Sequence, residues 1–363
     1  MNRLSLIPCV ALLAAGAVSA QTYTAVDLTP NGSGAASSAS AGLAAGYASS
    51  VANAFVGRAT LWTGDSAVDL HPDAIVGPGR STVNGFAGNL QVGSAASAST
   101  GNRNIPIAWS DTAASATVLP IPFVNAGGQA NATDGLQIVG SATGLNRDGT
   151  TLGSTHALIW DVATGAATDI GLDANLYGVA GGQQVGIVLK ALPNATLWRG
   201  TKAATSLHPK NAVVSYANAT DGVRQVGYAG FNVRIRQEAA NGNKDKRFNY
   251  AHVWNGTAAS GLNIHAGSSS FDGAVFEHSY ATSVSGSFVA GYATDLTKIG
   301  TPAYSRAIVW DAAFNPCDLS AFLPAGFVGS IASAVDADGN VAGVMTKADG
   351  SRHAVLWVLN PAQ

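Results

Sequence analysis

SAVDADGNVAGVMTKADGSRHAVLW, residues 333–357, contains the pattern that decides the fold, and six other parts of the chain repeat it. Its last five residues, 353–357, form a short apolar run that ends in tryptophan. The second copy, IPIAW at 105–109, departs from this run but keeps its tryptophan. A marker that recurs every 20–50 residues or so is typical of repeat proteins. The seven tryptophans are Trp62, Trp109, Trp160, Trp198, Trp254, Trp310 and Trp357.

A glycine marks a second fixed position in each copy. It follows a small or apolar residue, precedes a small, apolar or aromatic one, and comes before the tryptophan of its own copy. Two copies are nearly identical: NATDG occurs at 131–135 and again at 218–222, and each is followed by Val-Gly. Two markers that keep step seven times indicate true repeats. These glycines are Gly46, Gly93, Gly140, Gly186, Gly227, Gly291 and Gly343.

Each copy predicts four short strands separated by turns. The first alternates small and apolar residues, as in 331–335, the second carries the glycine, and the third ends at the tryptophan. The fourth contains a pair such as Asp-Leu at 69–70 or 318–319. The 343 residues after residue 20 divide into seven copies of 49, a length that suits one propeller blade. The sequence therefore predicts an all-β fold, a seven-bladed β-propeller of four-stranded blades, with a pair of β-sandwiches as the alternative.

The two ends of the chain predict how the ring closes. The last copy stops just after its third strand, at Trp357-Val358-Leu359, while residues 22–30 read as a fourth strand without the first three. We expect this N-terminal strand to pair with the C-terminal blade, residues 321–363, because closure removes the exposed sheet edges. An open solenoid would instead need polar capping repeats.

Residues 1–20 have the features of an export signal. One arginine, Arg3, precedes an apolar run from Leu4 to Val18, and small residues follow at 18–20. The run is too short to span a bilayer as a helix. We expect a signal peptide over 1–20, a single propeller domain over 21–363 with no further membrane span, and a secreted protein, extracellular or periplasmic.

Composition narrows the possible partners. The formal net charge is −2, so nothing indicates a nucleic-acid partner. Cys317 is the one cysteine after residue 20, so no internal disulfide is expected and stability must come from packing and strand pairing. We expect a monomer without a cofactor.

The repeat resembles the HAF-type bacterial extracellular repeat family. That unit consists of a glycine turn, Val-Gly-Tyr/Ser, His-Ala-Phe-Leu-Trp and Asp-Leu; residues 333–343 with 353–357 match it best, and HALIW at 156–160 comes next. No copy has phenylalanine after His-Ala, and several replace the histidine by arginine or asparagine. The resemblance implies export and a repeat fold, but no reaction and no catalytic residues.

Two patterns resemble metal sites, and we interpret both as structural. His156, His252 and His353 occupy equivalent positions in different blades, which places them apart, so we expect each ring to bind turn backbone. The turn from Asp336 to Asn340 resembles the start of a calcium loop but lacks the distal glutamate of such loops. The sequence predicts no metal site.

The fifth copy contains the strongest irregularity. Gly227 precedes Trp254 by 27 positions, whereas Gly343 precedes Trp357 by 14. The extra residues are rich in basic and aromatic side chains, which can hold an anionic polymer by ion pairing and stacking; a solvated hairpin is the alternative. The candidate binding residues are Arg234, Arg236, Lys244, Lys246, Arg247, Phe248 and Tyr250, with Phe231 beside them.

Other insertions, at 143–155 and 294–305, fall between the same two strands, so all three should lie on one face of the ring. We expect a secreted binding or surface-interaction module for a glycan or another extracellular polymer or protein. One alternative is an extracellular hydrolase or lyase with its site at the channel mouth, although no catalytic residues can be assigned and an enzyme is the weaker interpretation. The other is a structural envelope protein.

Overall fold

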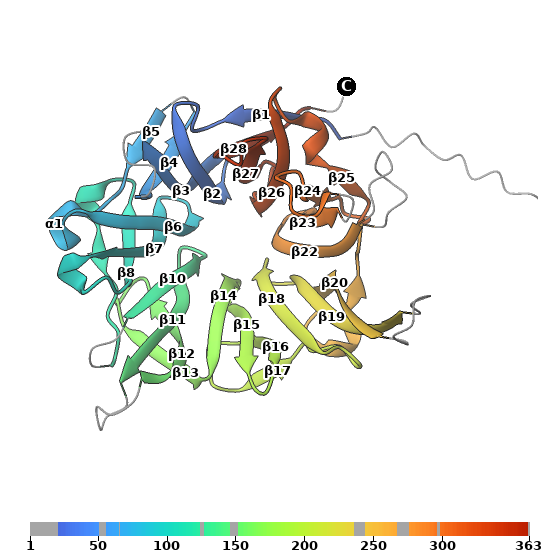
Figure 1. Ribbon diagram of the computed structural model, residues 1–363. Coiled ribbons are helices and arrows are strands. Elements are labelled where there is room, and N and C mark those ends of the chain that lie inside the picture. The colour runs from blue at the N-terminus through green and yellow to red at the C-terminus, as the bar shows by residue number, and fades with distance from the viewer. Residues whose placement is uncertain are drawn as a thin grey trace, which may run out of the picture.

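Seven four-stranded antiparallel sheets stand around a central axis like the blades of a propeller (Figure 1). The computed structural model describes residues 21–50, 56–64, 66–123, 127–145, 152–235, 244–266, 276–295 and 298–361. In each of the first six blades the strands follow one another in chain order from the axis outward. The predicted fold class is confirmed, while the proposed signal peptide, 1–20, lies outside the described residues.

In the first three blades, single helical turns lie between strands of one blade or between two blades. Blade 1 contains β2 (Gly32–Ser40), β3 (Leu43–Ser50), β4 (Arg58–Thr63) and β5 (Ser66–Asp69), followed by α1 (Asp73–Val76). Blade 2 contains β6 (Gly79–Ala87), β7 (Leu90–Ser97), η2 (Ala98–Thr100), β8 (Ile105–Ser110), η3 (Ala113–Ser115) and β9 (Thr117–Val118). Blade 3 contains β10 (Gly127–Thr133), β11 (Gln137–Leu145), β12 (Leu152–Asp161) and β13 (Ala167–Leu172).

The remaining blades repeat this arrangement. Blade 4 contains β14 (Ala174–Ala180), β15 (Gln183–Leu189), β16 (Pro193–Trp198) and β17 (Ala204–Ser206). Blade 5 contains β18 (Val214–Thr220), β19 (Gln225–Ile235), β20 (Lys244–Trp254), η4 (Ala258–Ser260) and β21 (Leu262–Asn263). Blade 6 contains β22 (Phe276–Ser285), β23 (Phe288–Asp295), β24 (Ser305–Trp310), β25 (Pro316–Asp318) and η6 (Leu319–Phe322). Blade 7 contains β26 (Phe327–Val335), β27 (Val341–Lys347), β28 (Arg352–Leu359) and β1 (Tyr23–Asp27).

The N-terminal strand closes the ring as predicted. β1 pairs antiparallel with β28, in register from Tyr23 opposite Leu359 to Asp27 opposite Val355. The paired strand is shorter than the predicted segment 22–30, but its backbone pairing continues where the amide of Leu28 donates to the carbonyl of Ala354 (2.9 Å). The outer edge of blade 7 is therefore made from the other end of the chain.

Every inner strand has a β-bulge at the same place, and the bulge explains the repeated glycine. In blade 2 the pairing of β6 with β7 skips Asn84. Opposite the bulge, a Cβ atom on Gly93 would collide with the carbonyl oxygen of Thr82. The corresponding glycine in each of the other blades would meet a carbonyl oxygen in the same way. Only glycine tolerates so close a backbone approach.

Most of the residues that the pairing skips form hydrogen bonds between neighbouring blades close to the axis. Asn84 donates from Nδ2 to the carbonyl of Ala130 in the next blade (2.9 Å), and Asn218 donates likewise to Ala281 (2.8 Å). Ser37, Asn131 and Thr282 make the equivalent bond, each to the inner strand of the following blade. Five of the seven junctions between blades therefore share this polar contact.

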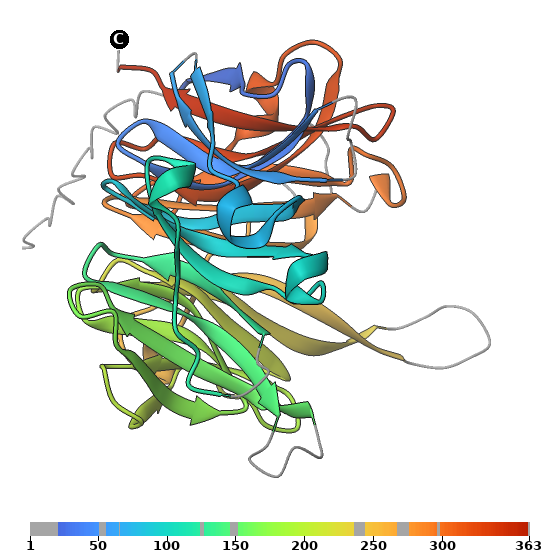
Figure 2. The same ribbon diagram turned by 90° about the vertical axis from the view of Figure 1, so that its left-hand side faces the viewer.

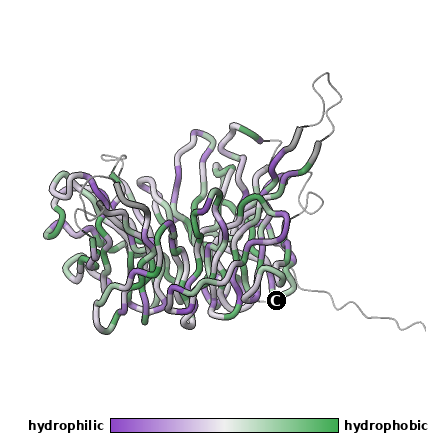
Figure 3. Tube along the Cα trace, turned by 90° about the horizontal axis from the view of Figure 1, so that it is seen from below, coloured by the Kyte–Doolittle hydropathy of each residue, from purple (hydrophilic) through white to green (hydrophobic). Residues whose placement is uncertain are grey.

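The core is divided among the seven junctions. Each of the seven buried apolar clusters spans two neighbouring blades, and each contains one of the seven tryptophans, packed against the preceding blade. No tryptophan is more than 3% exposed. Seen from the edge of the ring, hydrophobic positions accordingly occur across its whole width (Figure 3). In the described part of the chain, no helix has the length and apolar character that crossing a membrane requires.

Candidate functional site

One face of the ring carries the long connections. In a four-stranded antiparallel blade, the connections from second to third strand and from each blade to the next lie at the same end of the sheet. We call this the loop face; it is the face from which the β19–β20 hairpin projects (Figures 2 and 3). The insertions of the third and sixth copies connect the same pair of strands, with residues 146–151 and 296–297 outside the described residues.

The hairpin is a regular extension of blade 5. β19 and β20 stay in register from Gln225 opposite Trp254 to Ile235 opposite Lys244. Arg234 lies opposite Asp245, and Lys244 is the first residue of β20, but their side chains are not among those described. The predicted binding residue Arg236 lies outside the described residues.

Of the basic residues of the hairpin whose side chains are described, Lys246 points toward blade 6. Its ammonium forms an ion pair with Glu277 of β22 and lies over the ring of Phe248, 5.4 Å from the centroid. Glu277 is buried, whereas the lysine side chain is 45% exposed. The pair therefore anchors the hairpin to blade 6 and leaves part of the lysine open to solvent. The other described basic residue, Arg247, is exposed on β20.

Aromatic rings line the base of the hairpin. Tyr250 lies between Phe231 and Phe248, with ring centroids 6.3 Å from each and nearly parallel planes. Its ring also lies 4.7 Å from that of His265. Phe248 in turn packs against His278 of blade 6, 6.1 Å between centroids. The predicted pair Phe248 and Tyr250 therefore belongs to one continuous aromatic surface, half-buried at the junction of blades 5 and 6.

Polar contacts fix this surface in place. The backbone amide of Asn249 donates to Nδ1 of His278 (3.1 Å). The side-chain amide of Asn249 donates to the hydroxyl of Tyr280 (3.0 Å). Burial and the nearby charge of Lys246 lower the pKa of His278 below its usual value. A neutral imidazole is needed here because a protonated Nδ1 could not accept the Asn249 bond.

Below the hairpin, two stacked tyrosine pairs fill the space between neighbouring blades. Tyr216 and Tyr228 stack at 4.7 Å between centroids within blade 5, and Tyr280 and Tyr292 stack at 4.8 Å within blade 6. Tyr228 meets Tyr280 edge-on across the junction. Burial raises the pKa of Tyr292 to about 12, so its hydroxyl stays protonated at neutral pH.

The repeated histidines at the start of the third strands are structural, but their partners differ from those expected. His156 bonds through Nδ1 to the carboxylate of Asp169 (2.9 Å), and His353 to that of Asp27 (2.9 Å). Only His252 bonds to backbone, the carbonyl of Tyr250 in its own strand rather than a turn. The prediction of turn-backbone partners is wrong for His156 and His353 because the fourth strand brings an aspartate close to each ring. Asp169 lies opposite Leu158 and Asp27 opposite Val355, each two residues after the histidine that it binds.

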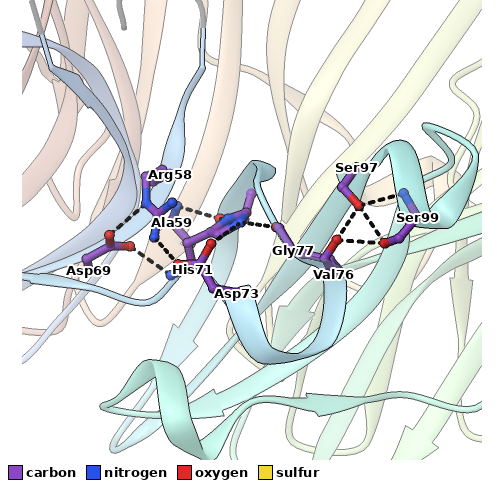
Figure 4. A network of polar contacts seen from close by, with 10 residues as sticks. Arg58, Ala59, Asp69, His71, Asp73, Val76, Gly77, Ser97 and Ser99 are labelled. Atoms are coloured by element: carbon purple, nitrogen blue, oxygen red, sulfur yellow. Dashed lines mark hydrogen bonds and ion pairs between the residues drawn. The ribbon is translucent and has the colours of Figure 1, made fainter. Parts of the chain in front are cut away.

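A second group of histidines connects neighbouring blades. His71 bonds through Nδ1 to Oγ of Ser81 (2.8 Å). The same oxygen also accepts from the amide of Ala59 in the preceding blade. Nε2 of His71 donates to the carbonyl of Gly77 (3.0 Å) (Figure 4). Because a carbonyl can only accept, Nε2 carries the proton and Nδ1 accepts from the serine hydroxyl. His208 repeats this arrangement with Ser215, Ala195 and the carbonyl of Ala212.

The turn that resembles a calcium loop is closed by the side chain of its own Asp336. The buried carboxylate of Asp336 accepts hydrogen bonds from the amides of Asp338 (3.0 Å) and Asn340 (2.9 Å) and from the side chain of Asn340 (3.0 Å). These contacts are those of a tight turn between β26 and β27. Among the described residues no group of three or more potential metal ligands comes together.

The central channel is lined by the inner strands, including the residues skipped at the bulges. It is a cavity of about 410 Å³ whose walls carry mostly serine, asparagine, threonine and small apolar side chains. Several of these polar groups are already bonded between blades, as described for Asn84 and Asn218.

These features define a seven-bladed β-propeller with a decorated loop face. The chain is similar to the β-propeller domain of the Trilobed protease from Pyrococcus furiosus, described as having an open velcro topology (12% identity, TM-score 0.53, 94% of this chain and 95% of that one). It is also similar to an oligogalacturonate lyase in complex with manganese (10%, 0.55, 94% and 97%) and to the Pyrococcus horikoshii acylaminoacyl peptidase (12%, 0.57, 92% and 52%).

At these identities the likeness concerns the fold alone. Neither protein-family models nor curated protein sequences give a match to this chain. In contrast to an open arrangement, the ring of this protein is closed by the pairing of β1 with β28.

Sequence reasoning missed the residues of blade 6 that complete the hairpin's base. Glu277 and His278 contact Lys246 and Phe248, and Tyr280 accepts the bond from Asn249. One signal was available: Glu277 is one of only two glutamates in the chain. Its partner could not be assigned without knowing how far the hairpin leans over the next blade.

Proposed function

We propose that this protein is a secreted binding module that holds an extracellular glycan against its loop face. The observation that carries the proposal is the aromatic surface of Phe231, Phe248 and Tyr250 at the base of a projecting hairpin, next to the partly exposed Lys246. Aromatic faces pack against the apolar faces of sugar rings, and a neighbouring cation attracts acidic groups.

The rigid scaffold supports this assignment. Binding residues commonly lie on loops positioned by a rigid framework, and the hairpin is tied to blade 6 through Glu277, His278 and Tyr280. The features of residues 1–20 and the resemblance to HAF-type extracellular repeats support export, and no feature of the repeat calls for a second subunit, so we propose a monomer. A hydrolase or lyase at the channel mouth and a structural envelope protein remain the alternative predictions.

A shortened hairpin tests the proposal. Replacing residues 232–247 by an Asn-Gly turn joins Phe231 to Phe248, a pair that already faces across the two strands, and removes Lys246. Affinity electrophoresis in gels that contain alginate, an acidic polysaccharide, or amylose, a neutral one, would compare the shortened chain with the intact protein. We expect the shortened chain to lose most of its retardation in the alginate gel.

Point variants separate the aromatic surface from the hairpin as a whole. Tyr250→Ala should weaken binding by about tenfold, as expected from the loss of a stacking platform. Val233→Ala is the matched control, because Val233 is exposed on the same hairpin and makes no part of the aromatic surface. Equal retardation of intact and shortened protein in every gel, or equal effects of the two point variants, would show that the hairpin takes no part in binding.

A further inference from the structure

A polar hollow lies on the loop face away from the hairpin, over blades 2 to 4. It encloses about 490 Å³, within the range of sites for small ligands. Its walls come from the start of β6, the connection after η2, the first residues of β10 and the end of β11, and it reaches Asn175 in blade 4. A second hollow of about 240 Å³ continues from it toward Tyr47 in blade 1. Arg80 and Asn104 line both.

The hollow exists because small side chains replace the tyrosines of blades 5 and 6. Tyr216 faces Tyr228 across the first two strands of blade 5, and the same two positions in blade 3 hold Gln129 and Ser141. In blade 2 they hold Thr82 and Ser94. Stacked rings therefore fill these positions in blades 5 and 6, whereas the same positions are open in blades 2 and 3.

The described lining of the hollow contains two arginines and several uncharged hydrogen-bonding groups. Arg80 and Arg103 are both exposed and both line the hollow. The guanidinium of Arg80 donates to Oδ1 of Asn104 (3.4 Å). None of the described carboxylates lies within ion-pair distance of this guanidinium. Arg103 is oriented by a bond from Nε to the carbonyl of Thr100 (3.3 Å). Among the described residues that line the two hollows, none is acidic.

We propose that this hollow is a separate binding site for an acidic oligosaccharide, a short run of uronic acid residues. Guanidinium groups bind carboxylates through charge-assisted hydrogen bonds. The amides of Asn104, Gln129 and Asn175 offer the donors and acceptors that sugar hydroxyls need. The volume accepts a few sugar units rather than a polymer coil. The second hollow, toward Tyr47, provides space into which a bound oligosaccharide can extend.

The site is distinct from the hairpin surface. The hairpin belongs to blade 5 and contacts blade 6 through Glu277, whereas the hollow ends at Asn175 in blade 4. None of its lining residues is part of the aromatic surface. A short ligand can therefore occupy the hollow whether or not the hairpin binds a polymer.

Titration calorimetry with a trimer of mannuronic acid tests the site, with neutral mannotriose as the comparison. We expect the acidic trimer to bind at least about tenfold more tightly, as loss of a charge-assisted bond implies, and its affinity to fall with added salt. Arg80→Gln and Arg103→Gln should each weaken it by about tenfold or more. Arg199→Gln is the matched control, because Arg199 is exposed in the turn between β16 and β17, on the opposite face; it should leave the affinity unchanged.

A second variant tests the hollow without changing charge. Ser141→Tyr places a tyrosine where blades 1, 5 and 6 already accept Tyr47, Tyr228 and Tyr292, and it should abolish binding of the trimer. The hairpin-shortened protein should bind the trimer as tightly as the intact one, so failure at the hairpin is distinguished from failure here. No binding of the acidic trimer, equal affinity for mannotriose, or full binding by Arg80→Gln would overturn the proposal.

Discussion

The amide of Gly42, in the first blade, donates a hydrogen bond of 2.8 Å to the carboxylate of Asp336 in the last. The carboxylate is buried, and the same side chain closes the turn between β26 and β27. One aspartate therefore joins the two blades between which the ring closes, close to the axis, while β1 and β28 join the chain ends farther out.

Replacing Asp336 by alanine should destabilise the protein by about 3 kcal/mol, because several buried donors lose their partner at once. Asp134→Ala is the control: Asp134 accepts from the amides of Leu136 and Gln137 within its own turn, between β10 and β11. Chemical denaturation would measure both. Similar losses of stability in the two variants would contradict a special role for Asp336 in ring closure.

Gly93→Ala should cost about 3 kcal/mol, the upper part of the range for overpacking, because its Cβ would meet the carbonyl oxygen of Thr82. Gly171 is the matched glycine: it also lies in a strand, but an added Cβ would meet nothing closer than 3.9 Å. Gly171→Ala should change the free energy of unfolding by about 1 kcal/mol at most, with either sign. Thermal melts of the two variants would show the difference.

Ser215→Ala should destabilise by about 1–3 kcal/mol, because the amide of Ala195 and Nδ1 of His208 both lose their partner in the core. Ser66, exposed in β5, provides the control, and Ser66→Ala should be nearly neutral. Denaturant titration of both variants would test this. If Ser215→Ala were neutral too, the serine would not be part of the connection between blades 4 and 5.

Acid should destabilise blades 5 and 6 before most carboxylates titrate. Burial lowers the pKa of His252, His265 and His278 in the folded protein, whereas histidine in the unfolded chain titrates near its ordinary value of about 6.5. Below that pH the unfolded chain takes up protons that the folded chain does not, so stability is present above it and is lost as the pH falls.

The melting temperature should therefore decrease as the pH is lowered from about 7 to about 5.5. His278→Asn keeps an acceptor for the amide of Asn249 but cannot titrate, so its melting temperature should decrease less. A steeper decrease than in the unaltered protein would show that His278 is not a source of the acid sensitivity.

Cys317 should react slowly with thiol reagents while the protein is folded. Burial, and then the neighbouring charge of Asp318, raise its pKa from 9.0 to about 11. At pH 8 this leaves about a hundredfold less of the reactive thiolate. In the chain from residue 21 onward Cys317 is the single cysteine, so release of thionitrobenzoate reports it alone, and denaturant should restore fast reaction. Fast reaction in the folded state would contradict the burial.

Much of the fold could be predicted from the sequence because each blade repeats its own markers. The tryptophans indicated the ends of the third strands, and residues 22–30 indicated the closing strand, confirmed in β1. The role of Gly93 and its equivalents could not be predicted, because it depends on a bulge in the facing strand that no local pattern reveals. The repeated markers recur once in each blade and can be read from the sequence. The bulge is a property of how two strands pair, so it cannot.

The candidate sites were harder to predict because they lie between blades. Sequence singled out the hairpin by its length and its basic residues, and Phe248 and Tyr250 do share one surface. It could not show that Lys246 is paired with Glu277, which is 31 residues further along. The sequence carried one signal of the hollow beside Arg80: Ser94 and Ser141 follow the marker glycine where other blades have tyrosine. Its meaning depends on how the blades pack, which the sequence does not show.

The pairing of β1 with β28 also has a consequence for how the protein is made. Synthesis produces residues 23–27 more than 300 residues before their partner, residues 355–359. A nascent or prematurely ended chain therefore has one strand with nothing to pair with and an uncovered edge on β27, and such edges invite association with other chains. Closure of the ring therefore has to wait until residues 355–359 have been synthesised.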